Sequence, residues 1–311
     1  MWRYALKRLL MMIPVVLGIT FIVFFIIDMA PGDPVYQIVG ERATQEQIEA
    51  AREEYGLNDN IFIRFFRYIF NLCKGDFGKS YISKEDVLRA YLNRLPATLS
   101  LAAASILVAL LIALPLGIIA ATHQNSWADS TSMVFALVGV SMPNFWLGLL
   151  LILFFALQLG WLPSGGMKGP TSIILPALTE GAYLSGLLTR TTRSSMLETI
   201  RADYMTTAMA KGVHPRKAIM KHAFRNSLIP IVTIAGIQFA YVMGGCIMTE
   251  SVFSWPGVGW SLVSAITDRD TPMITGFIIL TAVVTCIVNL LLDIAYAFID
   301  PRIKAQYSKT K

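Results

Sequence analysis

Long apolar stretches separated by shorter polar segments dominate the chain. A helix needs about 20 apolar residues to cross the roughly 30 Å hydrocarbon core of a bilayer. The first such stretch, Leu9 to Ile27, carries no charge between Arg8 and Asp28. It is longer than the apolar region of a secretory signal, about 7–15 residues, and no small-x-small cleavage site precedes Asp28. We therefore expect a retained membrane-spanning helix at this position.

Five further apolar stretches follow along the chain. They lie at approximately residues 98–121, 132–159, 173–189, 228–249 and 274–299. The stretch 132–159 is expected to be one helix, followed by the turn 160–166, whose tryptophan, proline and glycines are typical of an interface loop. The stretch 173–189 is the weakest of the series because it contains Glu180. The pattern predicts an all-α integral membrane protein with about six transmembrane helices.

The distribution of Lys and Arg predicts the orientation of these spans. If the amino terminus is cytoplasmic, the inside segments hold fifteen Lys and Arg residues, whereas the two short outside loops hold only Lys168 and Arg269. Short loops that are rich in Lys and Arg remain on the cytoplasmic side of a membrane. The segment 28–95 carries nine more, but its 68 residues make it too long for this rule. Both termini are therefore expected in the cytoplasm.

The overall composition agrees with a membrane protein. Hydrophobic residues make up 55% of the 311 residues and charged residues only 15%, whereas soluble domains carry about 25% charged residues. The net charge of +6 could suggest an anionic partner, but the basic residues gather beside the spans. We therefore expect contact with membrane lipid and none with nucleic acid. Three scattered cysteines are too few for a disulfide framework or a zinc site, so no metal or cofactor is expected.

Residues 28–95 form a segment large enough to fold outside the membrane. Amphipathic helical patterns run through 44–55 and 61–72. Thr44 is followed three residues later by Gln47, the spacing of a capping box at a helix start. We expect a small helical cap packed on the outer face of the bundle.

The segment 190–226, expected as a cytoplasmic loop, contains a short basic helix between two breaks. Asp203 to Lys211 has no helix breaker, Gly212 suits the left-handed position that ends a helix, and Pro215 suits the first turn of the next one. That next helix carries five basic or titratable side chains: Arg216, Lys217, Lys221, His222 and Arg225. Two interpretations follow from these features: a loop that contacts lipid headgroups, or a docking helix for a cytoplasmic partner.

The sequence contains no recognisable catalytic set. Neither H-E-x-x-H nor G-x-S-x-G occurs. Gly78-Lys79-Ser80 resembles the end of a phosphate-binding loop, but Cys73 stands where its first glycine belongs and no hydrophobic strand precedes it. We therefore expect no catalytic residue and no nucleotide site, and ATP hydrolysis would have to come from a partner.

Two carboxylates lie inside the predicted spans. A charge in mid-bilayer costs about 2.5–3.5 kcal/mol on insertion scales, so such residues usually face the bundle interior or a water-filled path. Glu180 would either line a path or make hydrogen bonds between helices. Asp293, with Asn289 one turn earlier on the same face, would either border the path or reach the inner membrane interface. Catalysis is not expected of them.

Several short motifs along the whole chain resemble one family. They are A-P-G-D-P at 30–34, G-D-F-G-K-S at 75–80, R-L-P-A-T at 94–98, P-N-F-W-L-G at 143–148, L-G-W-L-P at 159–163, E-S-V-F-S-W-P-G-V-G at 250–259 and D-P-R at 300–302. Together they make the sequence similar to the permease subunits of bacterial ABC importers for dipeptides, oligopeptides, nickel and glutathione. These permeases have a large external loop after the first helix.

The resemblance implies the type I fold of ABC importer permeases and a role for the basic loop. Residues 203–212 look like the motif that docks in a groove of the ATPase subunit. The docking residues would be Asp203, Ala208, Lys211, Gly212, Pro215, Arg216, Lys217 and Arg225. The sequence departs from the general motif, since Thr206-Thr207-Ala208 stands where Glu-Ala-Ala is usual and Pro230 lies further downstream. His214 replaces the Ser or Asp that would cap the second helix better.

The resemblance also implies the assembly and its location. In the bacterial inner membrane, this chain would form a translocation path with a second homologous permease, two ATP-binding subunits and an extracytoplasmic substrate-binding protein. Path candidates are Glu180, Asn144, Asn289 and Asp293. The expected parts are 1–27 with the first helix, the external 28–95, the five-helix core 96–303 and the tail 304–311. The alternatives are a stand-alone channel or secondary transporter, and an intramembrane enzyme. Peptides are the expected substrates, with nickel chelates, glutathione, haem or sugars as alternatives.

Overall fold

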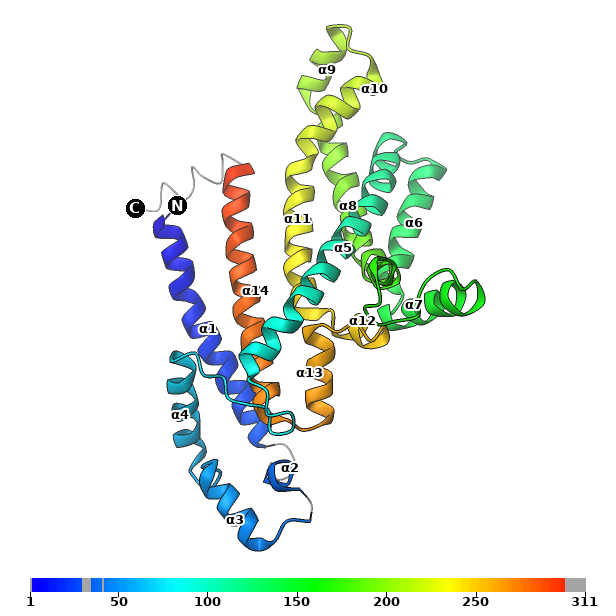
Figure 1. The fold of residues 1–311 in the computed structure, drawn as a ribbon. Coiled ribbons are helices and arrows are strands. Elements are labelled where there is room, and N and C mark those ends of the chain that lie inside the picture. The colour runs from blue at the N-terminus through cyan, green and yellow to red at the C-terminus, as the bar shows by residue number, and fades with distance from the viewer. Residues whose placement is uncertain (1, 30–34, 41, 300–311) are drawn as a thin grey trace. The chain divides into compact units, whose positions relative to one another are not determined.

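The computed structural model of the protein describes residues 2–29, 35–40 and 42–299. Within these residues the regular elements are helices, apart from one bridge between Lys79 and Asp86 (Figure 1). The motifs at 30–34 and 300–302 and the predicted tail 304–311 lie outside the described residues. The chain divides into two compact units. Of the described residues, the smaller unit comprises those in 2–98 and 256–288, and the larger unit comprises 99–255 and 289–299.

The smaller unit begins with the first apolar stretch and contains the segment that follows it. Its helices are α1 (Trp2–Asp28), α2 (Val35–Val39), α3 (Gln45–Glu54), α4 (Ile61–Cys73), α13 (Val258–Thr267), the start of α5 (Val87–Thr122) and most of α14 (Thr271–Ile299). The two amphipathic helices predicted in the external segment are confirmed as α3 and α4. The capping box is confirmed as well, since the Thr44 hydroxyl accepts from the Gln47 N–H while the Gln47 side chain accepts from the Thr44 N–H.

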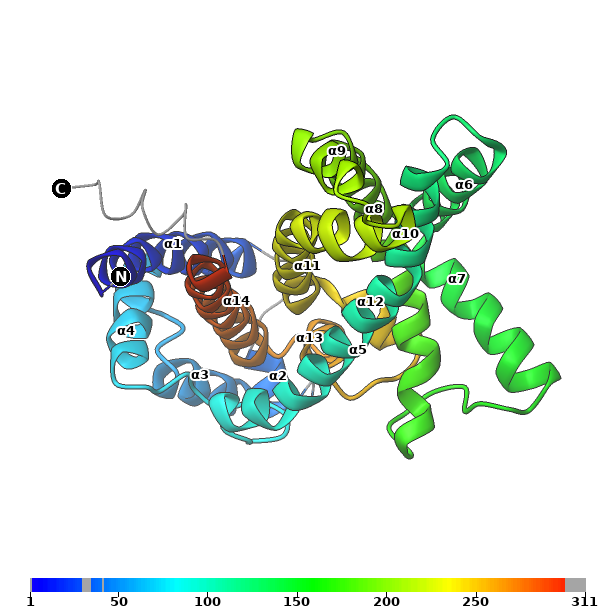
Figure 2. The same ribbon diagram turned by 90° about the horizontal axis from the view of Figure 1, so that it is seen from above.

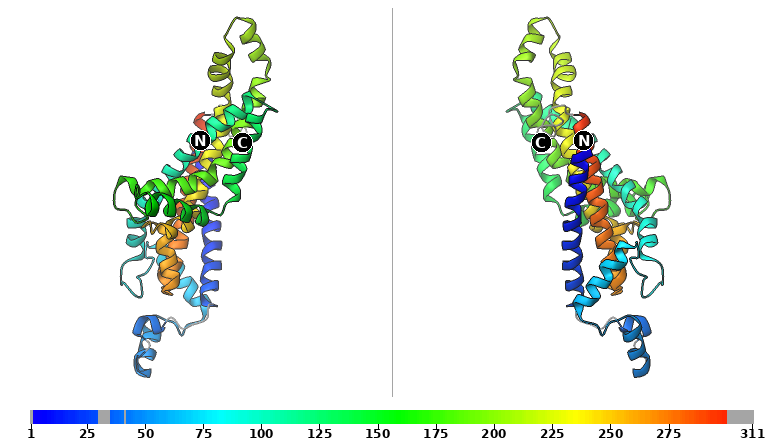
Figure 3. Two further views of the ribbon diagram at one scale, coloured as in Figure 1. Left: turned by 90° about the vertical axis from the view of Figure 1, so that its right-hand side faces the viewer. Right: turned by 90° about the vertical axis from the view of Figure 1, so that its left-hand side faces the viewer.

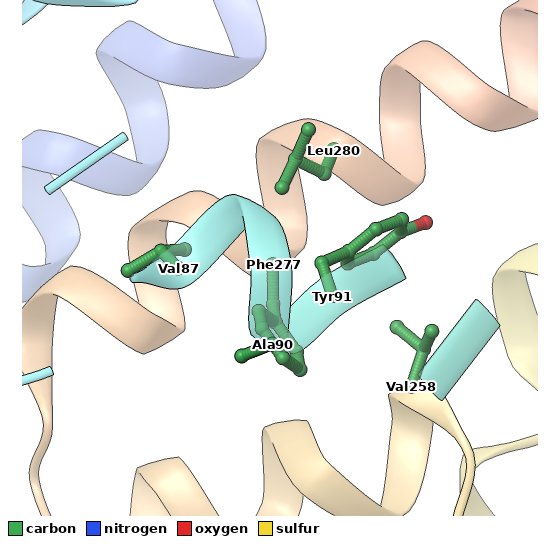
Figure 4. Packing of buried hydrophobic residues seen from close by; sticks show 6 residues of the cluster. All are labelled: Val87, Ala90, Tyr91, Val258, Phe277 and Leu280. Carbon is green, nitrogen blue, oxygen red and sulfur yellow. The ribbon is translucent and has the colours of Figure 1, made fainter. Parts of the chain in front are cut away.

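The core of the smaller unit joins the start of α5 to α13 and α14. Tyr91 and Phe277 meet edge to face, with ring centroids 5.4 Å apart (Figure 4). The buried residues of this cluster are Val87, Ala90, Tyr91, Val258, Phe277 and Leu280. An edge-to-face aromatic pair adds about 0.5–1.5 kcal/mol beyond the area it buries. The core therefore connects helices that are distant in the sequence.

A polar contact connects the loop before α5 to the start of α14. Asp270 accepts the Ser80 hydroxyl and, at 3.1 Å, the Tyr81 N–H. The Ser80 oxygen in turn accepts the N–H groups of Ile82 and Ser83, which fixes the turn that follows it. Burial raises the pKa of the neighbouring Tyr81 phenol to about 12, so this ring stays neutral at physiological pH. Asp270 is therefore the acceptor that holds this loop in place.

We expect Asp270→Ala to loosen the loop 78–87 without unfolding the rest of the chain. The substitution leaves a buried hydroxyl and an N–H without their acceptor, which costs about 1–3 kcal/mol per group. Hydrogen exchange of the loop amides, measured by mass spectrometry, should quicken about tenfold or more, since 1.4 kcal/mol corresponds to a factor of ten. Asp268→Ala is the matched control, because Asp268 is exposed at the end of α13. Equal exchange in both variants would contradict this role of Asp270.

The larger unit consists of the remaining helices. They are the rest of α5, α6 (Trp127–Ser141), α7 (Asn144–Leu151), the π-helix η1 (Ile152–Gln158), the 3-10 turn η2 (Pro170–Ile173), α8 (Ile174–Ile200), α9 (Asp203–Ala210), α10 (Pro215–Lys217), the π-helix η3 (Ala218–Ala223), α11 (Phe224–Gly245), α12 (Ile247–Val252) and the end of α14. Helix α8 is central, because α6, α7 and α11 all pack against it.

The third predicted span is not one helix. Its two halves, α6 and the α7–η1 segment, meet at an angle of 100°, and Figure 2 shows the bend. Met142 and Pro143 are both extended, with ψ 129° and 130°, and the next helix begins at Asn144. A residue before proline avoids helical geometry, and proline has no N–H to continue the ladder. The prediction of a continuous helix over 132–159 is therefore wrong.

The number of candidate spans differs from the predicted six. Among the described residues, four helices are long and apolar enough to cross a membrane: Arg8–Asp28, Val87–Thr122, Pro215–Gly244 and Thr271–Tyr296. The bent α6–α7 pair would be a fifth. The remaining predicted span corresponds to α8, which is 27 residues long but too polar to qualify by composition. The sixth span stays a prediction.

Candidate functional site

A helical hairpin connects the end of α8 to the start of α11. Figure 3 shows it as the yellow-green turn at the top of each view. Helix α8 extends to Ile200, and α9, α10 and η3 then lead back into α11. Of the predicted cytoplasmic segment 190–226, the first eleven residues continue α8 and the last three begin α11. The part between α8 and α11 is 201–223, and its last nine residues belong to the candidate span Pro215–Gly244.

The hairpin turn follows the predicted chemistry closely. Gly212 has φ +80°, the left-handed geometry predicted for it. Its N–H donates to the Met209 carbonyl, and the Val213 N–H donates to the Ala208 carbonyl at 3.2 Å. These are the two hydrogen bonds of a Schellman motif, which satisfies carbonyls at a helix end. Ala208 and Gly212 thus determine where α9 ends and how the chain turns.

The second helix of the hairpin begins at the predicted residue. Pro215 occupies its first turn, where the missing N–H is not needed. His214 is the capping residue, and its Nδ1 accepts the Arg216 N–H at 3.3 Å. The imidazole therefore caps this helix, as a Ser or Asp side chain at the same position would.

The hairpin has a buried inner face and an exposed outer face. Met205, Ala218 and Ala223 are buried against Met196 and Ala121 of the long helices. Of the eight predicted docking residues, six are exposed on the outer face of the hairpin: Asp203, Lys211, Gly212, Pro215, Arg216 and Lys217. Arg225 is exposed just beyond it in α11, and Ala208 is half-buried. Exposed apolar side chains lie among them: Tyr204, Met209 and Met220. The hairpin thus presents a mixed basic and apolar surface on an anchored support.

A buried carboxylate connects three helices of the larger unit. Glu180 on α8 is 2% exposed. It accepts a hydrogen bond of 3.1 Å from the Asn144 amide on α7 and one of 2.6 Å from the Thr249 hydroxyl on α12. Of the two interpretations that the sequence left open, hydrogen bonding between helices is confirmed. Thr249 was not predicted as part of this cluster, although it directly precedes the motif at 250–259.

Asn289 and Asp293 occupy a different helix. They lie one turn apart near the end of α14, where Asn289 is exposed and Asp293 is half-buried. One turn further on, the Tyr296 hydroxyl donates to the Thr233 carbonyl at 2.9 Å and so connects α14 to α11. The structure therefore brings Glu180 and Asn144 together, and it places Asn289 and Asp293 outside that cluster.

A second polar link was not predicted. The Arg193 guanidinium on α8 donates two hydrogen bonds of 2.7 Å to the Asp129 carboxylate on α6. Asp129 is buried and also accepts the Asn125 N–H. Such two-point arginine–carboxylate pairs fix geometry as well as add energy. Arg193 therefore helps to hold α8 beside α6, just before the hairpin.

Comparisons with known proteins place these features in context. The family described as "Binding-protein-dependent transport system inner membrane component" matches residues 113–305, and the family of N-terminal regions of such membrane components matches residues 1–102. The glutathione transport system permease protein GsiC of Escherichia coli (strain K12) is 41% identical over 304 residues, covering 98% of this chain and 99% of the relative. The dipeptide transport system permease protein DppB of Alkalihalophilus pseudofirmus is 39% identical, covering 98% and 100%.

Solved structures agree on the fold. The inward-facing MetNI methionine ABC transporter matches with a TM-score of 0.58 at 20% identity, covering 68% of this chain and 97% of that chain. An amino acid ABC transporter crystallised with histidines matches with a TM-score of 0.54 at 15% identity, again over 68% of this chain and 94% of that chain. At these identities the comparison shows similarity of the fold alone.

Proposed function

The chain belongs to the inner-membrane components of binding-protein-dependent transport systems, and we propose that it carries short peptides through a path built with a second, homologous permease. As a permease of an ABC importer it is the transport subunit and not the ATPase. Both well-covered relatives bear the names of transporters for small molecules with peptide bonds, a dipeptide in one case and glutathione in the other. That shared chemistry supports a short peptide as the substrate.

The hairpin 201–223 is the proposed contact with the ATP-binding subunits. Three observations support this role: its outer face is exposed, basic and partly apolar, its inner face packs on Met196 of α8 and Ala121 of α5, and its turn is held by backbone hydrogen bonds. A partner that moves the hairpin would therefore move two long helices together. Closure of two ATPases on ATP binding would rock the bundle between inward-open and outward-open states. An extracytoplasmic binding protein would deliver the peptide.

This assembly requires the hairpin and both termini to be cytoplasmic. The asymmetry of Lys and Arg between the short loops supports that orientation. The basic surface of the hairpin is part of the same asymmetry. In that orientation the hairpin would lie on the side of the membrane where the ATPases bind.

The path candidates belong to the same proposal. Asn289 is exposed within the candidate span Thr271–Tyr296. An amide in a span needs a polar partner or water. A path shared with a second permease would supply either one. Glu180 and Asn144 would border that path where α7 turns away from α6.

We expect the double variant Arg216→Glu, Lys217→Glu to lose its ATPase partners. Two exposed positive charges become negative on the proposed contact, and any acidic partner groups that faced them would then be repelled, which costs several kcal/mol across an interface. The measurement is the amount of ATPase that co-purifies with the tagged permease, together with uptake of a radiolabelled dipeptide. Both should fall at least tenfold, while the amount of permease in the membrane stays unchanged.

The matched control reverses two exposed lysines far from the hairpin in the sequence, Lys84→Glu and Lys168→Glu. It makes the same change in net charge and should keep the ATPases bound. Normal co-purification with Arg216 and Lys217 reversed would show that the hairpin is not the docking site. Transport by the purified permease alone, without ATP, would instead favour a stand-alone channel or secondary transporter.

A further inference from the structure

Helix α4 of the smaller unit carries an exposed aromatic stripe. Phe62, Phe66 and Phe70 recur every four residues and therefore share one face of the helix. All three are more than half exposed, with Phe66 at 66%, and Ile63 lies beside them. A soluble helix would normally turn polar residues outward on such a face. This stripe is not explained by the docking hairpin or by the buried carboxylate.

The side of α4 next to the stripe packs on the end of α1, and Phe62 of the stripe takes part in this contact. The Phe65 ring lies edge-on to Phe21 and Phe24, with centroids 5.6 and 5.7 Å away. The Phe62 ring contacts Phe25, and the Arg64 guanidinium pairs with the Asp28 carboxylate at 2.6 Å. Figure 1 shows α4 beside this end of α1.

These contacts set the depth of α4 relative to the membrane. Helix α1 is a candidate span that runs from Arg8 to Asp28, so its apolar part ends at Asp28. Phe21 lies seven residues earlier, which is about 10 Å at 1.5 Å per residue. Helix α4 therefore lies between the edge of the hydrocarbon core and a depth of about 10 Å, the depth of interfacial amphipathic helices.

The stripe continues an apolar surface that α1 also exposes. Ile22 and Ile26 on α1 are more than half exposed, as a helix that faces acyl chains would be. Two basic side chains lie near the stripe. Arg67 pairs with Asp59, and the Lys74 ammonium lies 4.1 Å from the centroid of the Phe70 ring at the end of the helix. A long basic side chain at this position can extend to the headgroups while its stem covers apolar surface.

We propose that α4 is an interfacial anchor helix whose Phe62, Phe66 and Phe70 stripe inserts into the acyl chains of one leaflet beside α1. The occupant of the stripe is lipid. The anchor holds the segment between α1 and α5 at the membrane surface, whichever side of the membrane that surface is. This anchor proposal requires that α1 crosses the membrane, and it does not depend on the proposal that the hairpin docks on the ATPases.

The test measures what surrounds position 66 in the assembled transporter. Phe66→Cys is placed in a background of Cys73→Ser and Cys286→Ser, which leaves the buried Cys246, and is labelled with a nitroxide. The complex is reconstituted in nanodiscs of phosphatidylcholine and phosphatidylglycerol. Collision rates of the nitroxide with oxygen and with a water-soluble nickel chelate are then measured by electron paramagnetic resonance.

Two further positions calibrate the result. Ile22→Cys on α1 reports on lipid, and Glu49→Cys on the exposed side of α3 reports on water. The proposal predicts that oxygen collisions exceed nickel collisions at position 66, as at position 22, and that the order reverses at position 49. High rates for both reagents at position 66 would place the stripe in water and overturn the proposal. Low rates for both would place a protein surface on it, with the same consequence.

Discussion

Gly186→Leu will prevent the chain from accumulating in the membrane as a folded protein. A side chain at this residue of α8 would begin 2.5 Å from the Ala136 carbonyl oxygen and would overlap the Val140 side chain, both on α6. Close helix approach in membranes depends on small residues at the contact. Forcing extra carbons into a packed contact costs about 1–3 kcal/mol when neighbours can shift, and more when the obstacle is backbone. The amount of monodisperse protein, measured by fluorescence-detected size-exclusion chromatography, should fall to a small fraction.

Gly18→Leu is the matched control for this result. Gly18 lies in α1, and nothing is found within 4 Å of the position where its side chain would begin. Leucine should be tolerated there, because it gains helix propensity of up to about 1 kcal/mol over glycine. If Gly186→Leu gave as much folded protein as Gly18→Leu, the close packing of α6 on α8 would be wrong.

Glu180→Ala will lower the melting temperature of the detergent-purified protein, and Glu180→Gln will not. Alanine leaves the Asn144 amide and the Thr249 hydroxyl without the oxygen that accepts from both. Leaving a buried polar group unpaired costs about 1–3 kcal/mol per group. Glutamine keeps an acceptor oxygen of the same reach and removes only the capacity for charge. The two variants therefore separate the structural role of the side chain from any role of its carboxylate.

Dipeptide uptake by the glutamine variant tests the path proposal. If Glu180 borders the path, uptake should fall at least fivefold although the melting temperature stays within the scatter of the unmodified protein. Unimpaired uptake by Glu180→Gln would leave Glu180 as a link between α7, α8 and α12 and would remove it from the path. Thr249→Val is the companion variant. It should lower the melting temperature without changing which substrate is carried.

Features that depend on neighbouring residues could be predicted from the sequence. The capping box at Thr44 and the left-handed Gly212 involve partners within five residues along the chain. Their geometry follows from backbone sterics and local hydrogen bonding. The first span depends only on the length of an uninterrupted apolar run. Such features hold in almost any tertiary surrounding.

The 100° bend could have been suspected but not measured from the sequence. Pro143 signals a break, but whether a helix kinks or turns sharply there depends on what the next segment packs against. In the structure, α7 packs against α8 and α12. The prediction treated 132–159 as one span because length and hydropathy do not carry this information.

The polar links between helices also needed the tertiary structure. Asp129 and Arg193 are 64 residues apart, and Glu180 and Thr249 are 69 apart. Apolar periodicity identifies a helix, but it does not show which polar side chain will face which across a contact. Arg193 was therefore taken as part of a cytoplasmic loop, whereas it is a partner of Asp129 on a continuous helix.

The sequence by itself determined the class of this protein, its apolar helices, the turn chemistry of the hairpin and, through short motifs along its length, its family. These depend on composition, on runs of apolar residues and on interactions within about one helical turn. The tertiary structure alone decided the bend after Ser141, the extension of α8 to Ile200 and the partners of Glu180 and Asp129. Those features depend on packing between helices that are far apart in the chain. Interiors are packed so closely that a side chain added at a contact glycine such as Gly186 would keep two helices from meeting.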